Sequence, residues 1–102
     1  MIELNKGYYP EILGILKKNV PQCEVLAFGS RYYGTEKDYS DLDLAIVGEE
    51  PAGDLVIDRM RDEFAESDIP FRVDILNLNT VSPEFRKIIE KGYKVIQMPA
   101  AK

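Results

Sequence analysis

The sequence predicts an α/β domain in which helices flank a mixed β-sheet of about four strands. Segments with apolar residues at helical spacing alternate with short apolar runs of strand length, at residues 24–29, 41–47, 69–78 and 93–98. The chain has 102 residues, of which 45% are apolar, so it can bury one core. We therefore expect a single domain that covers residues 1–102.

The first helix is expected at residues 10–20, where Pro10 suits the first helical position and Pro21 ends the helix. Gly14 weakens this helix by about 1 kcal/mol. Its apolar stripe consists of Ile12, Leu13, Leu16 and Val20. After the strand at 24–29, residues 30–34 predict a helical turn with Ser30 as its cap, and a polar loop follows.

The second half repeats this alternation. Strand 41–47 leads through a Pro- and Gly-containing turn to a helix at residues 55–67, whose apolar stripe is Ile57, Met60 and Phe64. Residues 69–78 predict a central strand. A helix at 82–92 has Ser82 as its cap and an expected buried stripe of Phe85, Ile88 and Ile89. Residues 93–98 predict a last strand, at an edge of the sheet.

Composition excludes several classes of protein. There is no histidine, so catalytic triads and zinc sites that depend on histidine are excluded, and acid–base or metal chemistry would rest on carboxylates. The net charge is −5 and the pI about 4.7, which argues against a nucleic-acid polymer as partner. The lone Cys23 predicts a buried apolar side chain, and no signal peptide or membrane span is expected, so we expect a cytoplasmic protein.

Asp41 and Asp43 open the strand at 41–47, and alternation places both on one face of that strand. The other face carries Leu42, Leu44 and Ile46, which can enter the core. At ~3.3 Å per residue the two aspartate Cα atoms are about 6.6 Å apart, so their carboxylates can lean together to hold Mg²⁺. Two solvated acids at the end of a strand are the alternative.

Asp74 lies within the apolar segment Phe71-Arg72-Val73-Asp74-Ile75-Leu76. A lone acid in such a strand is rare unless it is paired or bound to a metal. If this strand neighbours 41–47, Asp74 can reach Asp41 and Asp43, and three carboxylates can hold two ions for phosphoryl displacement. The alternative for Asp74 is a salt bridge to Arg31 or Arg72.

Gly29 and Ser30 follow the strand at 24–29. Gly29 allows a tight turn, and the free N–H groups of a helix that begins at Ser30 favour binding of phosphate. An ordinary serine cap is the alternative. A phosphate-loop ATPase is excluded, because Thr35 and Glu36 stand where lysine and serine or threonine are required after Gly34.

Gly29-Ser30, ten residues, and then Asp41-Leu42-Asp43 resemble the signature of the DNA polymerase β-like nucleotidyltransferase superfamily. More narrowly, the chain resembles its minimal nucleotidyltransferases over nearly the whole length, with Asp74 as the third acid. The resemblance implies a nucleotidyltransferase fold like the polymerase β palm, with two Mg²⁺ ions. Asp41 and Asp43 would bind both ions, and Asp74 would bind one and accept the proton of the attacking hydroxyl.

The resemblance further implies that Gly29 and Ser30, helped by Arg31, bind the phosphates of a nucleoside triphosphate. Many minimal members carry a small residue and an arginine where Tyr32 and Tyr33 stand, so a cation near the triphosphate is missing here unless Lys37 replaces it. The two tyrosines could stack on a base or pack in the core or on the surface.

Such domains are often paired with a HEPN-type toxin. The resemblance therefore predicts an antitoxin that transfers AMP from ATP to a toxin tyrosine. One alternative is a binding module that keeps the metal site and neutralises a partner by contact. Another is a nucleotidyltransferase for small molecules, although such enzymes usually carry an added acceptor domain that this chain lacks.

Overall fold

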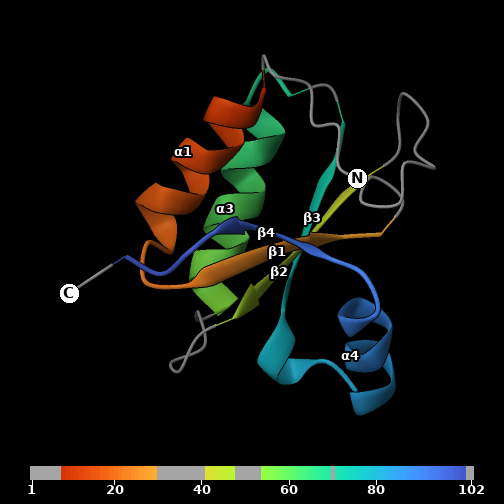
Figure 1. The fold of residues 1–102 in the computed structure, drawn as a ribbon. Coiled ribbons are helices and arrows are strands. Elements are labelled where there is room, and N and C mark those ends of the chain that lie inside the picture. Colours follow the sequence, from red (N-terminus) through yellow and green to blue (C-terminus); the bar gives the residue numbers. More distant parts are fainter. Residues whose placement is uncertain (1–7, 30–40, 48–53, 70, 101–102) are drawn as a thin grey trace.

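The computed structural model describes residues 8–29, 41–47, 54–69 and 71–100 of the chain (Figure 1). The predicted alternation of helices and strands is confirmed in these ranges. In chain order the elements are α1 (Tyr9–Asn19), β1 (Glu24–Phe28), β2 (Leu42–Val47), α3 (Asp54–Glu66), β3 (Val73–Asn77), a 3₁₀ turn (Leu78–Thr80), α4 (Pro83–Glu90) and β4 (Lys94–Gln97). The turn predicted at 30–34 lies outside the described residues.

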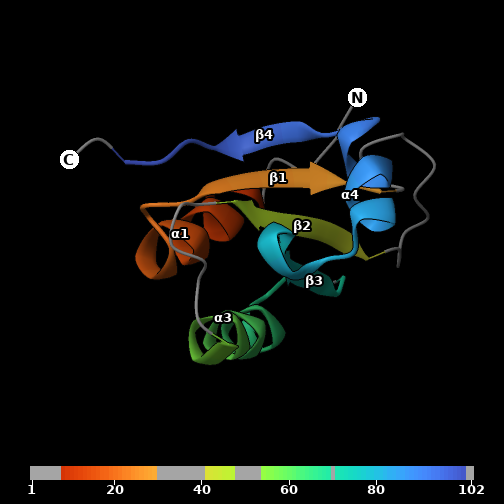
Figure 2. The ribbon, with the colours of Figure 1, turned by 90° about the horizontal axis from the view of Figure 1, so that it is seen from below.

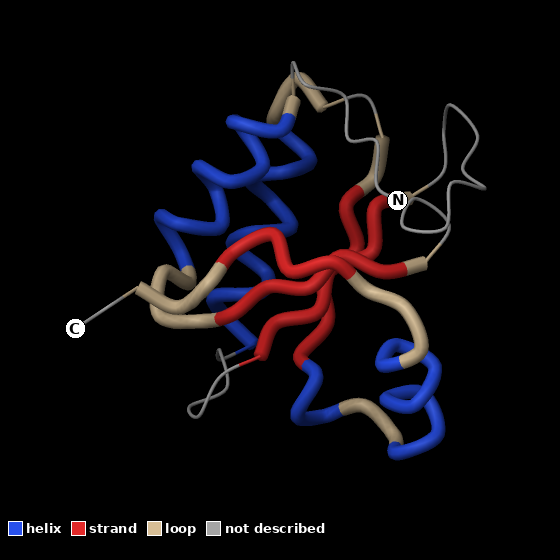
Figure 3. The backbone as a smooth tube through the Cα atoms, viewed as in Figure 1, coloured by secondary structure: helices blue, strands red, loops and turns tan. Residues whose placement is uncertain are grey.

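The four strands form one mixed sheet in the order β3-β2-β1-β4 (Figure 3). β1 is antiparallel to both β2 and β4, and β2 is parallel to β3. A parallel pair needs a crossover connection, and α3 makes it. The sheet class and the edge position of β4 were both predicted correctly from the sequence.

Helices α1 and α3 cover one face of the sheet, and α4 lies on the other (Figures 1 and 2). The core between α1, α3 and the sheet contains the predicted stripe of α3 and the inward residues of β2. Its fully buried members include Ile12, Leu16, Cys23, Leu42, Leu44, Met60 and Ile75. The burial of Cys23 confirms the prediction that it acts as a small apolar side chain.

The second core is smaller and lies on the α4 face. Ile89 packs there against Leu26, Phe28, Ala45 and Leu78. Ser82 caps α4 as predicted, since its Oγ accepts a hydrogen bond of 3.2 Å from the backbone N–H of Phe85. The predicted buried stripe of α4 is confirmed for Ile89 and wrong for Phe85 and Ile88, which are 40% and 61% exposed. Phe85 still contacts the sheet, because its ring meets that of Phe28 edge-to-face with 6.2 Å between the centroids.

The prediction of a central strand at 69–78 is also wrong, because β3 is an edge strand and is shorter, Val73–Asn77. Its apolar residues are explained by α3, which packs over it. Arg61 on α3 covers part of the open edge, where its Nη2 donates a hydrogen bond of 2.8 Å to the carbonyl oxygen of Ile75. None of the helices in the described ranges has the length and apolar character to cross a bilayer.

Candidate functional site

Phe28, Asp43 and Asp74 form a row across three neighbouring strands. Phe28 on β1 is the register partner of Asp43 on β2, and Asp43 is the register partner of Asp74 on β3. The three side chains share the α4 face, because register partners lie on the same side of a sheet. The next row, Ala27, Leu44 and Ile75, faces the opposite side and is completely buried. The acids are therefore fixed by the best-packed part of the sheet.

Gly29 closes the end of this row. Its φ is +81°, a conformation that glycine adopts without strain. A β-carbon placed on Gly29 would overlap Oδ2 of Asp43. The glycine thus permits both the turn after β1 and the close approach of the backbone to the carboxylate. The sequence predicted the turn but not this contact.

Asp43 is the acid whose pKa is raised by burial and by the charges of the other two, Asp74 and Asp41. Burial, and then the charges of Asp74 and Asp41, raise the pKa of Asp43 from 3.8 to about 6. Asp43 and Asp74 are both half-buried, whereas Asp41 is exposed and lies just before β2. The structure thus brings the three predicted acids into one electrostatic group from two strands.

The predicted alternatives for these acids differ in outcome. A salt bridge between Arg72 and Asp74 is absent from the ion pairs of the described residues. Arg31 lies outside those residues, and so do Ser30, Tyr32, Tyr33 and Lys37. The predicted phosphate-binding site and the predicted lack of a cation near the triphosphate therefore stay predictions. Only the turn at Gly29 lies within the described residues.

The donor set fits a hard cation such as Mg²⁺, because it consists of carboxylate oxygens on one face. The pKa of Asp43 is raised first by burial and then by the negative charges of Asp74 and Asp41, which a bound cation would offset. In the described part of the chain, no three acidic, cysteine or histidine side chains are close enough together to form a finished ligand set. Like charges at this spacing repel, so the carboxylates would have to lean inward around a cation.

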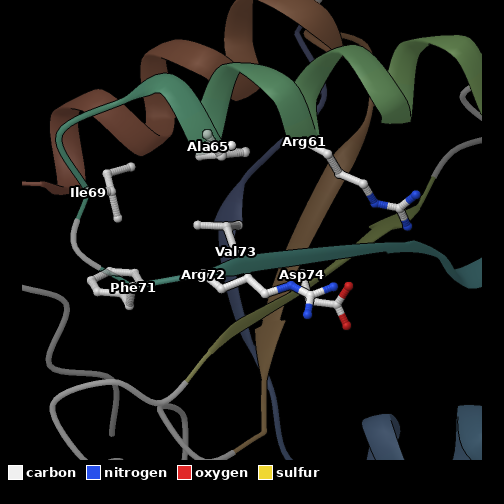
Figure 4. A pocket seen from close by; sticks show the side chains of 8 residues that line it. Arg61, Ala65, Ile69, Phe71, Arg72, Val73 and Asp74 are labelled. Atoms are coloured by element: carbon white, nitrogen blue, oxygen red, sulfur yellow. The ribbon is translucent and has the colours of Figure 1, made fainter.

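A cavity of about 410 Å³ adjoins Asp74 at the open edge of β3, between that strand and α3 (Figure 4). We call it the β3-edge cavity. Its lining residues are Arg61, Phe64, Ala65, Ile69, Phe71, Arg72, Val73 and Asp74. Sequence reasoning missed this feature because it assigned the strand to the middle of the sheet.

Comparison with known proteins decides the family. Residues 10–96 match a family model described as a nucleotidyltransferase domain. This chain belongs to the nucleotidyltransferase domain family. It is also 55% identical over 83 residues to a Haemophilus influenzae protein named "Probable protein adenylyltransferase MntA", a match that covers 81% of this chain and 73% of that protein. Nucleotidyltransferases generally use divalent metal ions.

Solved structures confirm the fold of this nucleotidyltransferase. A chain from the crystal structure of a toxin–antitoxin with AMP-PNP superposes with a TM-score of 0.75, at 23% identity, over 91% of this chain and 73% of that chain. A second match is to a chain of the tri-AMPylated Shewanella oneidensis HEPN toxin in complex with MNT antitoxin. Its TM-score is 0.68, at 19% identity, over 91% of this nucleotidyltransferase and 71% of that chain. The predicted nucleotidyltransferase fold is therefore correct.

Proposed function

We propose that this nucleotidyltransferase transfers AMP from ATP to a tyrosine hydroxyl of a HEPN-type toxin and so acts as an antitoxin. The single observation that carries the proposal is the row that sets Asp43 opposite Asp74, with Gly29 against Asp43. It is supported by the 55% identity to an adenylyltransferase and by the fold shared with toxin–antitoxin complexes. We expect the reaction to take place in the cytoplasm.

In the proposed reaction the tyrosine oxygen attacks the α-phosphorus of ATP. A bond forms between that oxygen and phosphorus, and the bond from phosphorus to the oxygen that bridges to the β-phosphate breaks. Pyrophosphate leaves with that oxygen and its electron pair. Asp74 accepts the proton of the tyrosine hydroxyl, a role for which its position beyond Asp43, on the edge strand, leaves access to an acceptor.

Asp41 and Asp43 would hold two Mg²⁺ ions, with Asp74 as a further ligand of one of them. When bound, these ions would neutralise charge on the phosphates and the attacking oxygen. Asp43 is suited to this role because it is fixed between Phe28 and Asp74, and it binds a cation in its ionised form. Gly29 and Ser30, with Arg31, would bind the triphosphate beside it.

The test is transfer of label from ATP labelled at the α-phosphate to the HEPN-type toxin encoded beside this chain. ATP labelled at the γ-phosphate should leave the toxin unlabelled, because pyrophosphate departs. Asp43→Asn and Asp74→Asn should each lose transfer by at least about 100-fold. Asp62→Asn, an exposed acid on α3, is the matched control and should retain it.

Two outcomes would reject the proposal. One is full transfer by Asp43→Asn. The other is a wild-type chain that binds and neutralises the toxin without labelling it, with the same protection from Asp43→Asn. The second result would establish neutralisation by contact in place of catalysis.

A further inference from the structure

We propose that an exposed apolar patch on the α4 face, formed by Phe85, Ile88 and Tyr93, is the surface on which the acceptor protein docks. We call it the α4 patch. This inference rests on the proposed function and deepens it by naming the surface that holds the acceptor protein during transfer. The patch would bind the acceptor protein and take no part in the chemical step, so docking and catalysis can be measured apart.

The α4 patch gathers apolar side chains that the core does not use. In α4 only Ile89 is buried, whereas Phe85 and Ile88 are exposed. Tyr93 is also exposed, and it lies two residues before Val95, which packs on the α4 face, so strand alternation places Tyr93 on that face. Of the five large apolar side chains exposed in the described ranges, these three lie within residues 85–93. Such a concentration is typical of a site where another protein binds.

The α4 patch adjoins the row of acids. Phe85 belongs to the patch, and its ring meets that of Phe28 edge-to-face. Phe28 is the register partner of Asp43, and both share the α4 face of the sheet with Asp74. Helices α1 and α3 cover the other face (Figures 1 and 2). A protein whose hydroxyl reaches Asp74 must therefore approach from the side of the sheet on which the patch lies.

The position of the α4 patch favours the acceptor protein over a second copy of this chain. A second copy seated on the patch would lie over the same face as Asp43 and Asp74, and would stand in the way of an acceptor. A typical protein interface covers about 800 Å² on each partner, which is enough to include both the patch and the row. The acceptor protein can therefore cover the patch and reach the acids in one complex.

Lysines border the α4 patch. Lys91 lies three residues after Ile88, so the two are neighbours on the helix surface, and Lys87 lies four residues before Lys91. Neither lysine forms an ion pair with another residue that the structure describes. Glu84 is the acid on this border, four residues before Ile88. We therefore expect the docking surface of the acceptor protein to be apolar at its centre, with carboxylates opposite the lysines.

The test separates docking from transfer. Replacing the acceptor tyrosine of the toxin by phenylalanine gives a toxin that can bind but cannot receive AMP. Ile88→Asp should raise the Kd for this toxin at least about tenfold in calorimetry, because docking would bury the new carboxylate against an apolar surface. Leu55→Asp is the matched control, since Leu55 is 81% exposed on α3, on the other side of the sheet, and this variant should bind as wild type does.

Both variants should keep the affinity of wild type for an ATP analogue with Mg²⁺ and should unfold at the same urea concentration, because neither replaced side chain is buried. With the reactive toxin, Ile88→Asp should raise KM for the toxin at least about tenfold and leave kcat unchanged. Chemical footprinting of the wild-type complex gives a second readout. The bound toxin should slow acetylation of Lys91 severalfold and leave that of Lys17, on α1, unchanged.

Each contrary result has a distinct meaning. Wild-type affinity from Ile88→Asp, or an equal loss from Leu55→Asp, would overturn the α4 patch while transfer itself stands. A weaker affinity of Ile88→Asp for the ATP analogue would assign the patch to the nucleotide, and a wild-type dimer that Ile88→Asp separates would assign it to a second copy; both overturn the inference. A wild-type chain that binds the toxin without labelling it, with binding lost in Ile88→Asp, would reject the proposed transfer and leave the patch as the docking surface.

Discussion

The backbone of Gly29 lies so close to the carboxylate of Asp43 that a β-carbon at position 29 would overlap Oδ2. Gly29 comes directly after β1 and Asp43 lies on the adjacent antiparallel β2, where its register partner is Phe28. The turn at Gly29, which leads toward the predicted phosphate-binding residues, therefore packs directly against Asp43. Any side chain at position 29 must therefore displace the carboxylate of Asp43.

Gly29→Ala should damage both the fold and the site. The positive φ of Gly29 makes any side chain strained there, and the overlap forces Asp43 to move. We expect the free energy of unfolding to fall by about 1–3 kcal/mol in urea titrations, with AMP transfer lost. Gly14→Ala is the control, because a β-carbon there meets no other atom and the helix should become more stable. Wild-type transfer by Gly29→Ala would show that the contact is unnecessary.

Asp43 should make stability fall as pH rises. Its pKa is about 6 in the folded chain, above the ordinary 3.8, so the folded chain binds this proton more tightly than the unfolded chain does. The stabilisation is complete below pH 3.8 and is lost as pH rises through about 6. A shift of this size is about 3 kcal/mol at most, and we expect about 1–2 kcal/mol after solvent screening.

Asp43→Asn should therefore unfold at higher urea than wild type at pH 7.5, and the difference should shrink toward pH 4 without added Mg²⁺. Asp62→Asn controls for the loss of one negative charge. If the difference in stability between Asp43→Asn and wild type does not vary with pH, ionisation of Asp43 does not destabilise the folded chain.

Asp41 and Asp43 should serve mainly to bind the ions and the nucleotide, and Asp74 mainly to accept the proton. If Asp41 and Asp43 hold the ions shared with the triphosphate, Asp43→Asn should lose both Mg²⁺-dependent binding of an ATP analogue and transfer. Asp74→Asn should lose transfer by at least about 100-fold yet keep most of the binding. Calorimetry with and without Mg²⁺, beside the labelling assay, measures both quantities. Equal loss of binding in the two variants would contradict the assignment of Asp74 as base.

Arg61→Ala should expose the edge of β3. Removing its 2.8 Å hydrogen bond to the Ile75 carbonyl oxygen should cost about 1 kcal/mol of stability. An uncovered edge strand pairs readily with another chain, so self-association should increase in sedimentation velocity. Arg59→Ala, on the same helix, controls for the lost charge. An Arg61→Ala chain that stays as monodisperse as the control would show that α3 alone protects the edge.

Much of the fold was accessible from the sequence because burial follows periodicity. Ile57, Met60 and Phe64 repeat at the spacing of a helix, and Leu42, Leu44 and Ile46 at that of a strand, so their common face could be predicted. The acids could be located because they interrupt these patterns. The sequence predicted that Asp74 would lie near Asp41 and Asp43 if β2 and β3 were neighbouring strands. The structure confirms that these two strands pair.

The errors came from features that periodicity does not encode. The stripe of α4 is amphipathic, yet only Ile89 is buried, because burial depends on how much of the sheet the helix reaches. β3 is apolar yet lies at an edge, because α3 covers it. The β3-edge cavity arises between these two elements, so no single segment of the sequence could predict it.

The parallel pairing of β2 with β3 also sets when the site can exist during synthesis. A nascent chain that has emerged only as far as β2 contains Gly29, Asp41 and Asp43, but α3 and β3 must still follow before Asp74 arrives opposite Asp43. Domains fold as units while the ribosome delivers them, and this pairing joins residues distant in sequence. Catalytic competence would therefore require translation past β3, and a chain terminated before β3 would carry Asp41 and Asp43 without the proposed base Asp74.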